Sequence, residues 1–77
     1  MSPTVEKIRK ILAEQMDIDA DKIKGSTDIA EDLGADSLSV VELMMAVEEE
    51  FGIIIDEEET KNFKTVDDVA RYIDDNV

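Results

Sequence analysis

Ser37 is the side chain in this sequence best placed to carry a chemical group. It follows Gly34-Ala35-Asp36 and stands directly before an apolar helical pattern, so its hydroxyl is expected at the start of a helix. A phosphodiester there would lie beside unpaired backbone N–H groups, at the positive end of the helix dipole. Gly34 lets the preceding loop turn tightly into the helix. An ordinary N-cap serine is by far the commoner role for Asp-Ser before an apolar run, and the spacing leaves both interpretations open.

A catalytic role for Ser37 would require a base close to its hydroxyl. The sequence contains no histidine and no cysteine, which removes the commonest base and the commonest metal ligands. The nearest basic residues along the chain, Lys24 and Lys61, are far from Ser37. We therefore expect a protein that is not an enzyme and has no catalytic residues of its own.

Three aspartates resemble the beginning of a calcium-binding loop. Asp17, Asp19 and Asp21 alternate like the first ligands of an EF-hand. The pattern then fails, because Lys22 stands where the loop requires glycine and Asp28 stands where it requires a bidentate glutamate. We expect no specific metal site, only weak attraction of divalent cations by the negative charge.

The charge of the chain indicates which partners it can meet. It has 21 acidic and 8 basic residues, a net charge of −13, and no basic residue between Lys24 and Lys61. This sign excludes nucleic acid and anionic membranes, and it favours proteins with basic patches. No segment is long and apolar enough to cross a bilayer, and the N-terminus shows no signal or transit peptide. We expect a cytoplasmic protein with no membrane insertion.

Three segments show helical periodicity and predict three main helices. The first, over about residues 4–16, has one apolar face formed by Val5, Ile8, Ile11, Leu12 and Met16. The second spans about 37–51, ends at Gly52, and has a core stripe of Val40, Leu43, Met44, Val47 and Phe51. The last begins at Thr65 and buries Val66, Val69, Ala70 and Ile73. Thr65 and Asp68 have the spacing of a capping box.

The intervening segments complete an all-α fold. Residues 17–36 read as a long loop, compatible with a short helical turn at about 28–33, and its expected anchors are Ile18, Ile23, Ile29 and Leu33. A brief third helix should follow Asp56, which stands at capping-box spacing from Glu59. The run 53–55 reads as a buried connector, because a strand there would have no partner. The sequence thus predicts one domain, residues 1–77, with three main helices and one short helix in a small bundle.

The outer face of the second helix combines acidic and apolar side chains. Leu38, Glu42, Met45 and Glu49 follow one another at spacings of four, three and four residues, so they share this face. Glutamates would attract a basic partner, while leucine and methionine offer adaptable apolar contact. The same pattern fits a half-buried helix flank with solvated glutamates, and spacing alone does not separate the two.

The motif around Ser37 resembles the attachment motif of acyl carrier proteins. Asp36-Ser37-Leu38 stands between Asp32-Leu33-Gly34-Ala35 and Val41-Glu42-Leu43, the run 45–51 is similar to the rest of that family's second helix, and 65–68 is similar to its last helix start. The resemblance covers essentially the whole chain, and it indicates a free-standing, type II carrier. It implies that a separate Mg²⁺-dependent transferase attaches 4′-phosphopantetheine to Ser37, and that the arm carries acyl groups as thioesters.

The resemblance also implies roles for other residues. Asp36 and Leu38 would flank the attachment site, with Asp36 helping the metal and docking of the transferase. The positions that match the family's partner-docking face are Glu42, Met45, Glu48 and Glu49. The positions that match its acyl pocket are Val41, Leu43, Met45, Ala46, Phe51 and Ile55. The implied partners of such a monomer are the phosphopantetheinyl transferase and acyl-chain synthases, reductases, dehydratases and acyltransferases with basic patches.

The pathway is the least determined of these expectations. The acidic second helix favours fatty acid biosynthesis, and a specialised polyketide or lipid pathway is the alternative. Ser39, Ile54 and Asp56 depart from residues often found in the family, which bears on partner preference. A second class of protein, an unmodified acidic interaction or divalent-cation-binding protein, remains an alternative that modification of Ser37 would exclude.

Overall fold

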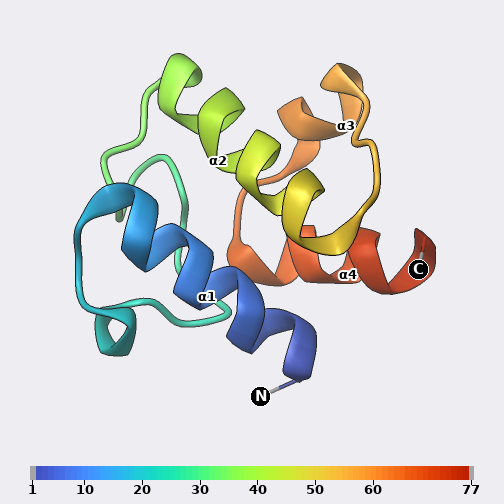
Figure 1. Cartoon of the computed structure of the whole chain (residues 1–77). Helices are drawn as coiled ribbons and strands as arrows, with labels where there is room; N and C mark the ends of the chain where they lie inside the picture. The colour runs from blue at the N-terminus through green and yellow to red at the C-terminus, as the bar shows by residue number, and fades with distance from the viewer. Residues whose placement is uncertain (1, 77) are drawn as a thin grey trace.

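The chain folds as a small bundle of helices, as the periodicity predicted. A computed structural model describes residues 2–76. It contains four α-helices and one 3₁₀-helix: α1 (Pro3–Met16), η1 (Ala20–Lys22), α2 (Ser37–Phe51), α3 (Glu57–Asn62) and α4 (Val66–Asn76). In Figure 1, α3 lies beside α2, and the long loop leaves α1 and passes back along it before reaching α2. The all-α prediction, with three main helices and one short one, is confirmed.

Local signals set the ends of the two longest helices. The Ser2 hydroxyl accepts a hydrogen bond from the N–H of Val5 at 3.2 Å, and Pro3 occupies the first turn of α1, where a missing N–H costs nothing. Helix α2 begins at Ser37 and ends before Gly52, which adopts the left-handed conformation with φ 65°. Both bounds of α2 agree with the sequence prediction.

The core joins all three main helices. Its fully buried side chains include those of Ile8, Leu12, Ile23, Leu43, Val47, Val66, Val69 and Ile73. Met44 is also buried, whereas Val40 and Phe51 are half-buried at the edge of the predicted stripe of α2. The apolar periodicity therefore identified the inward faces correctly.

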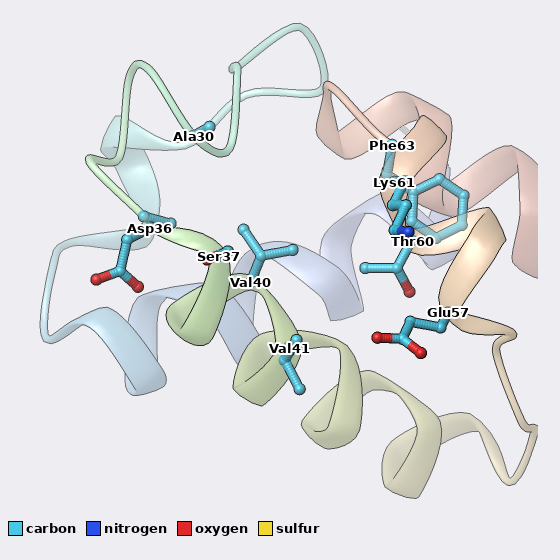
Figure 2. A pocket seen from close by; sticks show the side chains of 10 residues that line it. Ala30, Asp36, Ser37, Val40, Val41, Glu57, Thr60, Lys61 and Phe63 are labelled. Carbon is cyan, nitrogen blue, oxygen red and sulfur yellow. The ribbon is translucent and has the colours of Figure 1, made fainter.

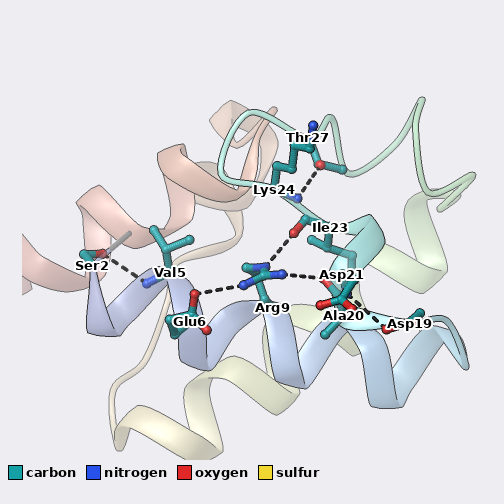
Figure 3. A network of polar contacts seen from close by, with 10 residues as sticks. All are labelled: Ser2, Val5, Glu6, Arg9, Asp19, Ala20, Asp21, Ile23, Lys24 and Thr27. Carbon is teal, nitrogen blue, oxygen red and sulfur yellow. Dashed lines mark hydrogen bonds and ion pairs between the residues drawn. The ribbon is translucent and has the colours of Figure 1, made fainter.

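The long loop is fixed by apolar anchors and by one arginine. Ile23 and Ile29 are buried, and Ile18 and Leu33 are half-buried against the core, as predicted. Arg9 of α1 adds a contact that the sequence did not indicate. Its guanidinium donates to the carbonyl of Ile23 at 2.5 Å and to that of Ala20 at 2.7 Å (Figure 3). The loop, and with it the approach to Ser37, is thereby attached to α1.

Two polar contacts complete the course of the loop. The N–H of Asp32 donates to the carbonyl of Asp28 at 2.9 Å. This bond closes one helical turn within residues 28–33, where the sequence allowed for such a turn. The N–H of Ile29 donates to the carbonyl of Lys64 at 2.9 Å, so the loop is also tied to the segment before α4.

The connector between α2 and α3 differs from the prediction. Ile55 is buried and Ile53 is half-buried, but Ile54 is 85% exposed. The interpretation of the whole run as buried was wrong, because three consecutive side chains of an irregular segment cannot all face one core. The capping box expected at Asp56 is also absent, since this side chain makes no cap hydrogen bond to α3.

The capping box before α4 is present and gives a pH-dependent prediction. The Asp68 carboxylate accepts hydrogen bonds from the N–H groups of Thr65 and Lys64, at 3.0 Å each, and the Thr65 hydroxyl accepts from Asp68 N–H at 3.2 Å. The hydrogen bond from the Thr65 N–H to the carboxylate, and after it the one from the Lys64 N–H, lower the pKa of Asp68 below its ordinary value of 3.8. A lowered pKa stabilises the folded state above that ordinary value, and the contribution is lost as the pH falls through the lowered pKa.

We therefore expect Asp68→Asn to lower the urea midpoint at neutral pH. The difference from the unsubstituted protein should shrink as the pH falls below about 3.8, the ordinary pKa of this group. Asp75→Asn, at an exposed position of the same helix, is the matched control and should show no such trend. A difference that is independent of pH would contradict a role for the Asp68 charge.

Candidate functional site

Ser37 stands exposed at the first position of α2. Asp36 precedes it as the N-cap, and its carboxylate accepts a hydrogen bond from the N–H of Ser39 at 2.8 Å. This bond is the main cause of a pKa of Asp36 below its ordinary value, so its carboxylate is anionic at neutral pH. Within residues 2–76, the Ser37 hydroxyl makes no hydrogen bond, because Asp36 already provides the cap. The hydroxyl is free to react with a group brought by another protein.

A cavity of about 390 Å³ opens beside Ser37 between α2 and α3. Val40 and Val41 form its α2 side, and Figure 2 shows Glu57 and Thr60 of α3 across from Val41. The complete lining is Ala30, Ala35, Asp36, Ser37, Val40, Val41, Glu57, Thr60, Lys61 and Phe63. Since Ser37 is part of this wall, a flexible group attached to its hydroxyl can turn into a largely apolar space.

A second cavity, of about 140 Å³, continues along the same pair of helices. It shares Val41, Glu57 and Thr60 with the first cavity, so the two are neighbours. Its remaining lining comes from Met44, Met45, Glu48 and Ile55. The space between α2 and α3 therefore runs from Ser37 toward the connector that joins the two helices.

The residues expected in the acyl pocket are divided by the structure. Val41, Met45 and Ile55 line the cavities between α2 and α3. Ala46 instead lines a hollow on another side of α2, together with Gln15 of α1. Leu43 is 1% exposed and belongs to the core. Phe51 is half-buried and packs against the core, and the centre of its ring lies 5.7 Å from the Lys7 ammonium.

Sequence reasoning missed the α3 side of these cavities. Thr60, Lys61 and Phe63 line the first cavity, yet a helix of six residues is too short to show a periodic apolar face. Val40 was assigned to the core stripe, and it lines the cavity from the edge of that stripe. Only the tertiary arrangement of α3 against α2 brings these residues near Ser37.

The outer face of α2 carries three of the four expected docking residues in exposed positions. Glu42, Met45 and Glu49 are exposed, and so are Leu38 and Val41 beside them. Glu48 differs, because it is half-buried and its carboxylate accepts a hydrogen bond from the N–H of Ile55 at 2.7 Å. Glu48 thus faces the connector.

The acidic side chains do not assemble into a metal site in the described part of the chain. No group of three or more aspartates and glutamates is arranged to hold an ion within residues 2–76. The first positions of the EF-hand-like pattern lie in a different structure, since Ala20–Lys22 forms a 3₁₀-helix. None of the described helices has the length and apolarity of a membrane span.

The chemistry of Ser37 fits a phosphate-linked arm. A helix N-terminus stabilises an anion covalently attached to its first residue, and the adjacent cavity can receive the apolar part of such a group. Among the ionisable side chains that line this cavity, Asp36 accepts the N–H of Ser39, and Glu57 and Lys61 lie across the cavity on α3.

Comparisons with known proteins agree with this geometry. The family model described as "Phosphopantetheine attachment site" matches residues 6–73. The acyl carrier protein of Bdellovibrio bacteriovorus is 48% identical over 68 residues, which cover 88% of this chain and 87% of that protein. The solved structure of the acyl carrier protein from Enterococcus faecalis superimposes with a TM-score of 0.79 at 36% identity, covering 96% of this chain and 94% of that one. The chain therefore belongs to the acyl carrier protein family, whose prosthetic group is 4′-phosphopantetheine.

Proposed function

We propose that this protein carries acyl intermediates of fatty acid biosynthesis as thioesters on a 4′-phosphopantetheine arm attached to Ser37. The observation that supports this most directly is the exposed Ser37 hydroxyl, which lies at the start of α2 and opens on the cavity between α2 and α3. In this proposal residues 1–77 form one acyl carrier domain of a monomeric cytoplasmic protein. The domain is a substrate and scaffold for its partners and catalyses no step itself.

The residues around Ser37 support the arm in three ways. The N-terminus of α2 stabilises the charge of the phosphodiester. Asp36 keeps the first turn of the helix ordered through its bond to Ser39, and it presents an anionic carboxylate to the metal of the transferase. Val40 and Val41 offer apolar surface on which carried acyl groups can be sheltered from water. When the arm is attached, its thiol would form the thioester with the acyl group.

Partner enzymes would approach the outer face of α2, next to Ser37. Glu42 and Glu49 are exposed there, and Leu38 and Met45 share this face at 66% and 58% exposure. This face suits basic patches on the phosphopantetheinyl transferase and on synthases, reductases, dehydratases and acyltransferases. Glu48 contributes less to docking than the sequence suggested, since its carboxylate is engaged with Ile55.

Charge reversal on this face should weaken partner binding and leave the fold intact. We expect the double substitution Glu42→Lys and Glu49→Lys to raise the Kd for a cognate condensing enzyme by about tenfold or more at low salt, because attraction becomes repulsion. Titration calorimetry measures the Kd, and circular dichroism verifies the helix content. The control is Glu14→Lys, an exposed position on α1. Equal affinities for the double variant and the unsubstituted protein would remove the docking assignment.

The pathway is tested by reconstituting a round of chain extension. The modified protein is supplied with malonyl-coenzyme A, acetyl-coenzyme A as the primer, an acyltransferase and a condensing enzyme of fatty acid synthesis, and the attached acyl groups are followed by mass spectrometry. We expect malonyl loading, followed by condensation with the acetyl primer and loss of carbon dioxide, which leaves an acetoacetyl group on the arm. Modification of the protein without loading or extension by these enzymes would favour a specialised polyketide or lipid pathway.

A further inference from the structure

Glu48 stands at the far end of the cavities that begin at Ser37. It lines the second cavity together with Met44, Met45 and Ile55. It also lines a separate surface hollow of about 420 Å³, formed with Gly52, Ile53 and Ile54. Only two residues, Met45 and Glu48, belong to the lining of both spaces in the described part of the chain. These two side chains therefore form the wall between the second cavity and the hollow beyond it.

Of these two side chains, Glu48 is the one held in place. Its carboxylate accepts the N–H of Ile55 at 2.7 Å, while its main-chain carbonyl accepts the N–H groups of Gly52 and Ile53, the latter at 3.2 Å. Glu48 thus holds the connector through both its side chain and its backbone. Met45 is 58% exposed and has a flexible apolar side chain, against which a hydrocarbon can pack.

A hydrocarbon chain cannot displace the Glu48 carboxylate without loss. Displacement would break the bond to Ile55 and leave the N–H of this buried residue without a partner. Contact with an apolar chain would also remove the carboxylate from water with no compensating charge, since neither described ion pair involves Glu48. The carboxylate therefore closes the apolar space, whereas an apolar residue at this position would extend it.

We propose that Glu48 sets the longest acyl chain that this protein shelters. The inference rests on the proposed function, because it assumes a chain tethered at Ser37. Such a chain enters the first cavity, passes Val41 and Thr60 into the second, and ends against Glu48. Glu48 is in this account a specificity-determining residue rather than a docking residue.

The test compares acyl chains that differ by two carbons. The protein is loaded from a series of saturated acyl-coenzymes A by a phosphopantetheinyl transferase, and the rate of thioester cleavage by hydroxylamine is measured for each length. Sheltered chains hold the thioester near the protein and slow cleavage. For the unsubstituted protein we expect protection to increase with chain length up to a limit and then to decline. In Glu48→Ala the limit should shift by about two to four carbons, because truncation opens the wall toward the hollow.

Two matched variants separate the wall from the charge of the helix. Glu48→Gln keeps the shape and an acceptor for Ile55 N–H, so its limit should stay close to that of the unsubstituted protein. Glu50→Ala removes an exposed charge of the same helix, which lines neither the second cavity nor the hollow, and should not shift the limit. An unchanged limit in a folded Glu48→Ala variant, or an equal shift in Glu50→Ala, would overturn the inference.

A measurement on the unsubstituted protein keeps the inference testable if Glu48→Ala does not fold. Hydrogen exchange of the Ile55 amide should be slow with short acyl chains and should accelerate at the length where protection declines, because the chain end then competes with the Glu48–Ile55 bond. Uniform exchange across the series would contradict the inference. If the protein does not accept the arm, the proposed function fails together with the inference. If it accepts the arm but the limit does not depend on Glu48, only the inference fails.

Discussion

Ser37→Ala should abolish modification of the protein completely. On incubation with coenzyme A, Mg²⁺ and a phosphopantetheinyl transferase, the unsubstituted protein should gain the mass of one phosphopantetheine, and the variant should gain none. The reason is chemical, since alanine has no oxygen to form the phosphodiester. The fold should be unaffected, because the Ser37 side chain is exposed and Asp36 provides the helix cap.

Ser39→Ala is the matched control for this experiment. Ser39 lies two residues further along α2, and its N–H still donates to Asp36 when its hydroxyl is removed. We expect this variant to be modified like the unsubstituted protein. Modification of Ser37→Ala, or loss of modification in Ser39→Ala alone, would show that the attachment site has been assigned to the wrong residue.

Arg9→Met should produce the largest loss of stability among the polar substitutions considered. The Arg9 side chain is only 13% exposed, and it donates to the carbonyls of Ile23 and Ala20 and to the Glu6 carboxylate (Figure 3). Methionine retains much of the apolar stem but removes every donor, so the two carbonyls lose charge-assisted bonds. We expect the free energy of unfolding to fall by about 2–4 kcal/mol, a large share of the stability of a small domain.

Urea unfolding of Arg9→Met and Lys10→Met measures this effect. Lys10 is the next residue of α1, but it is exposed and belongs to neither described ion pair. We expect Lys10→Met to change the free energy of unfolding little, by less than about 0.5 kcal/mol. A similar loss in both variants would mean that charge, rather than the attachment of the loop to α1, accounts for the effect.

Local sequence signals predicted the helices well. The bounds of α2 followed from Asp36 and Ser37 before an apolar run and from Gly52 after it, and the structure gives the same residues. Thr65 and Asp68 form the predicted reciprocal bonds before α4. A cap depends on residues three or four positions apart, which the sequence shows directly, although the same spacing at Asp56 and Glu59 forms no cap bond.

Contacts between distant segments were not accessible from the sequence. Nothing in the periodicity of α1 distinguishes Arg9, which reaches the loop, from Lys10, which faces solvent. The inward turn of Glu48 depends in the same way on where the connector places Ile55. Glu48 and Glu49 look alike in the sequence, yet only one has a backbone N–H within reach.

Only the part of the candidate site that lies on one helix could be predicted, because the rest depends on contacts between distant segments. Ser37 and the exposed face of α2 lie on a single helix, so the sequence offered them as candidates, and the resemblance to acyl carrier proteins, rather than spacing, favoured their roles. The cavities require α3 to pack against α2, and they use Thr60, Lys61 and Phe63, for which spacing gave no signal. Leu43 and Phe51 were expected deep in the pocket because of the family resemblance, whereas their helical periodicity had placed them in the core stripe, where the structure has them.

The most direct test of the central claim is the mass of the protein isolated from its own host. Peptide mapping with mass spectrometry should find phosphopantetheine, free or acylated, on the peptide that contains Ser37, and no such group elsewhere. A protein whose Ser37 is entirely unmodified in growing cells, and also stays bare with a competent transferase, would contradict its role as an acyl carrier.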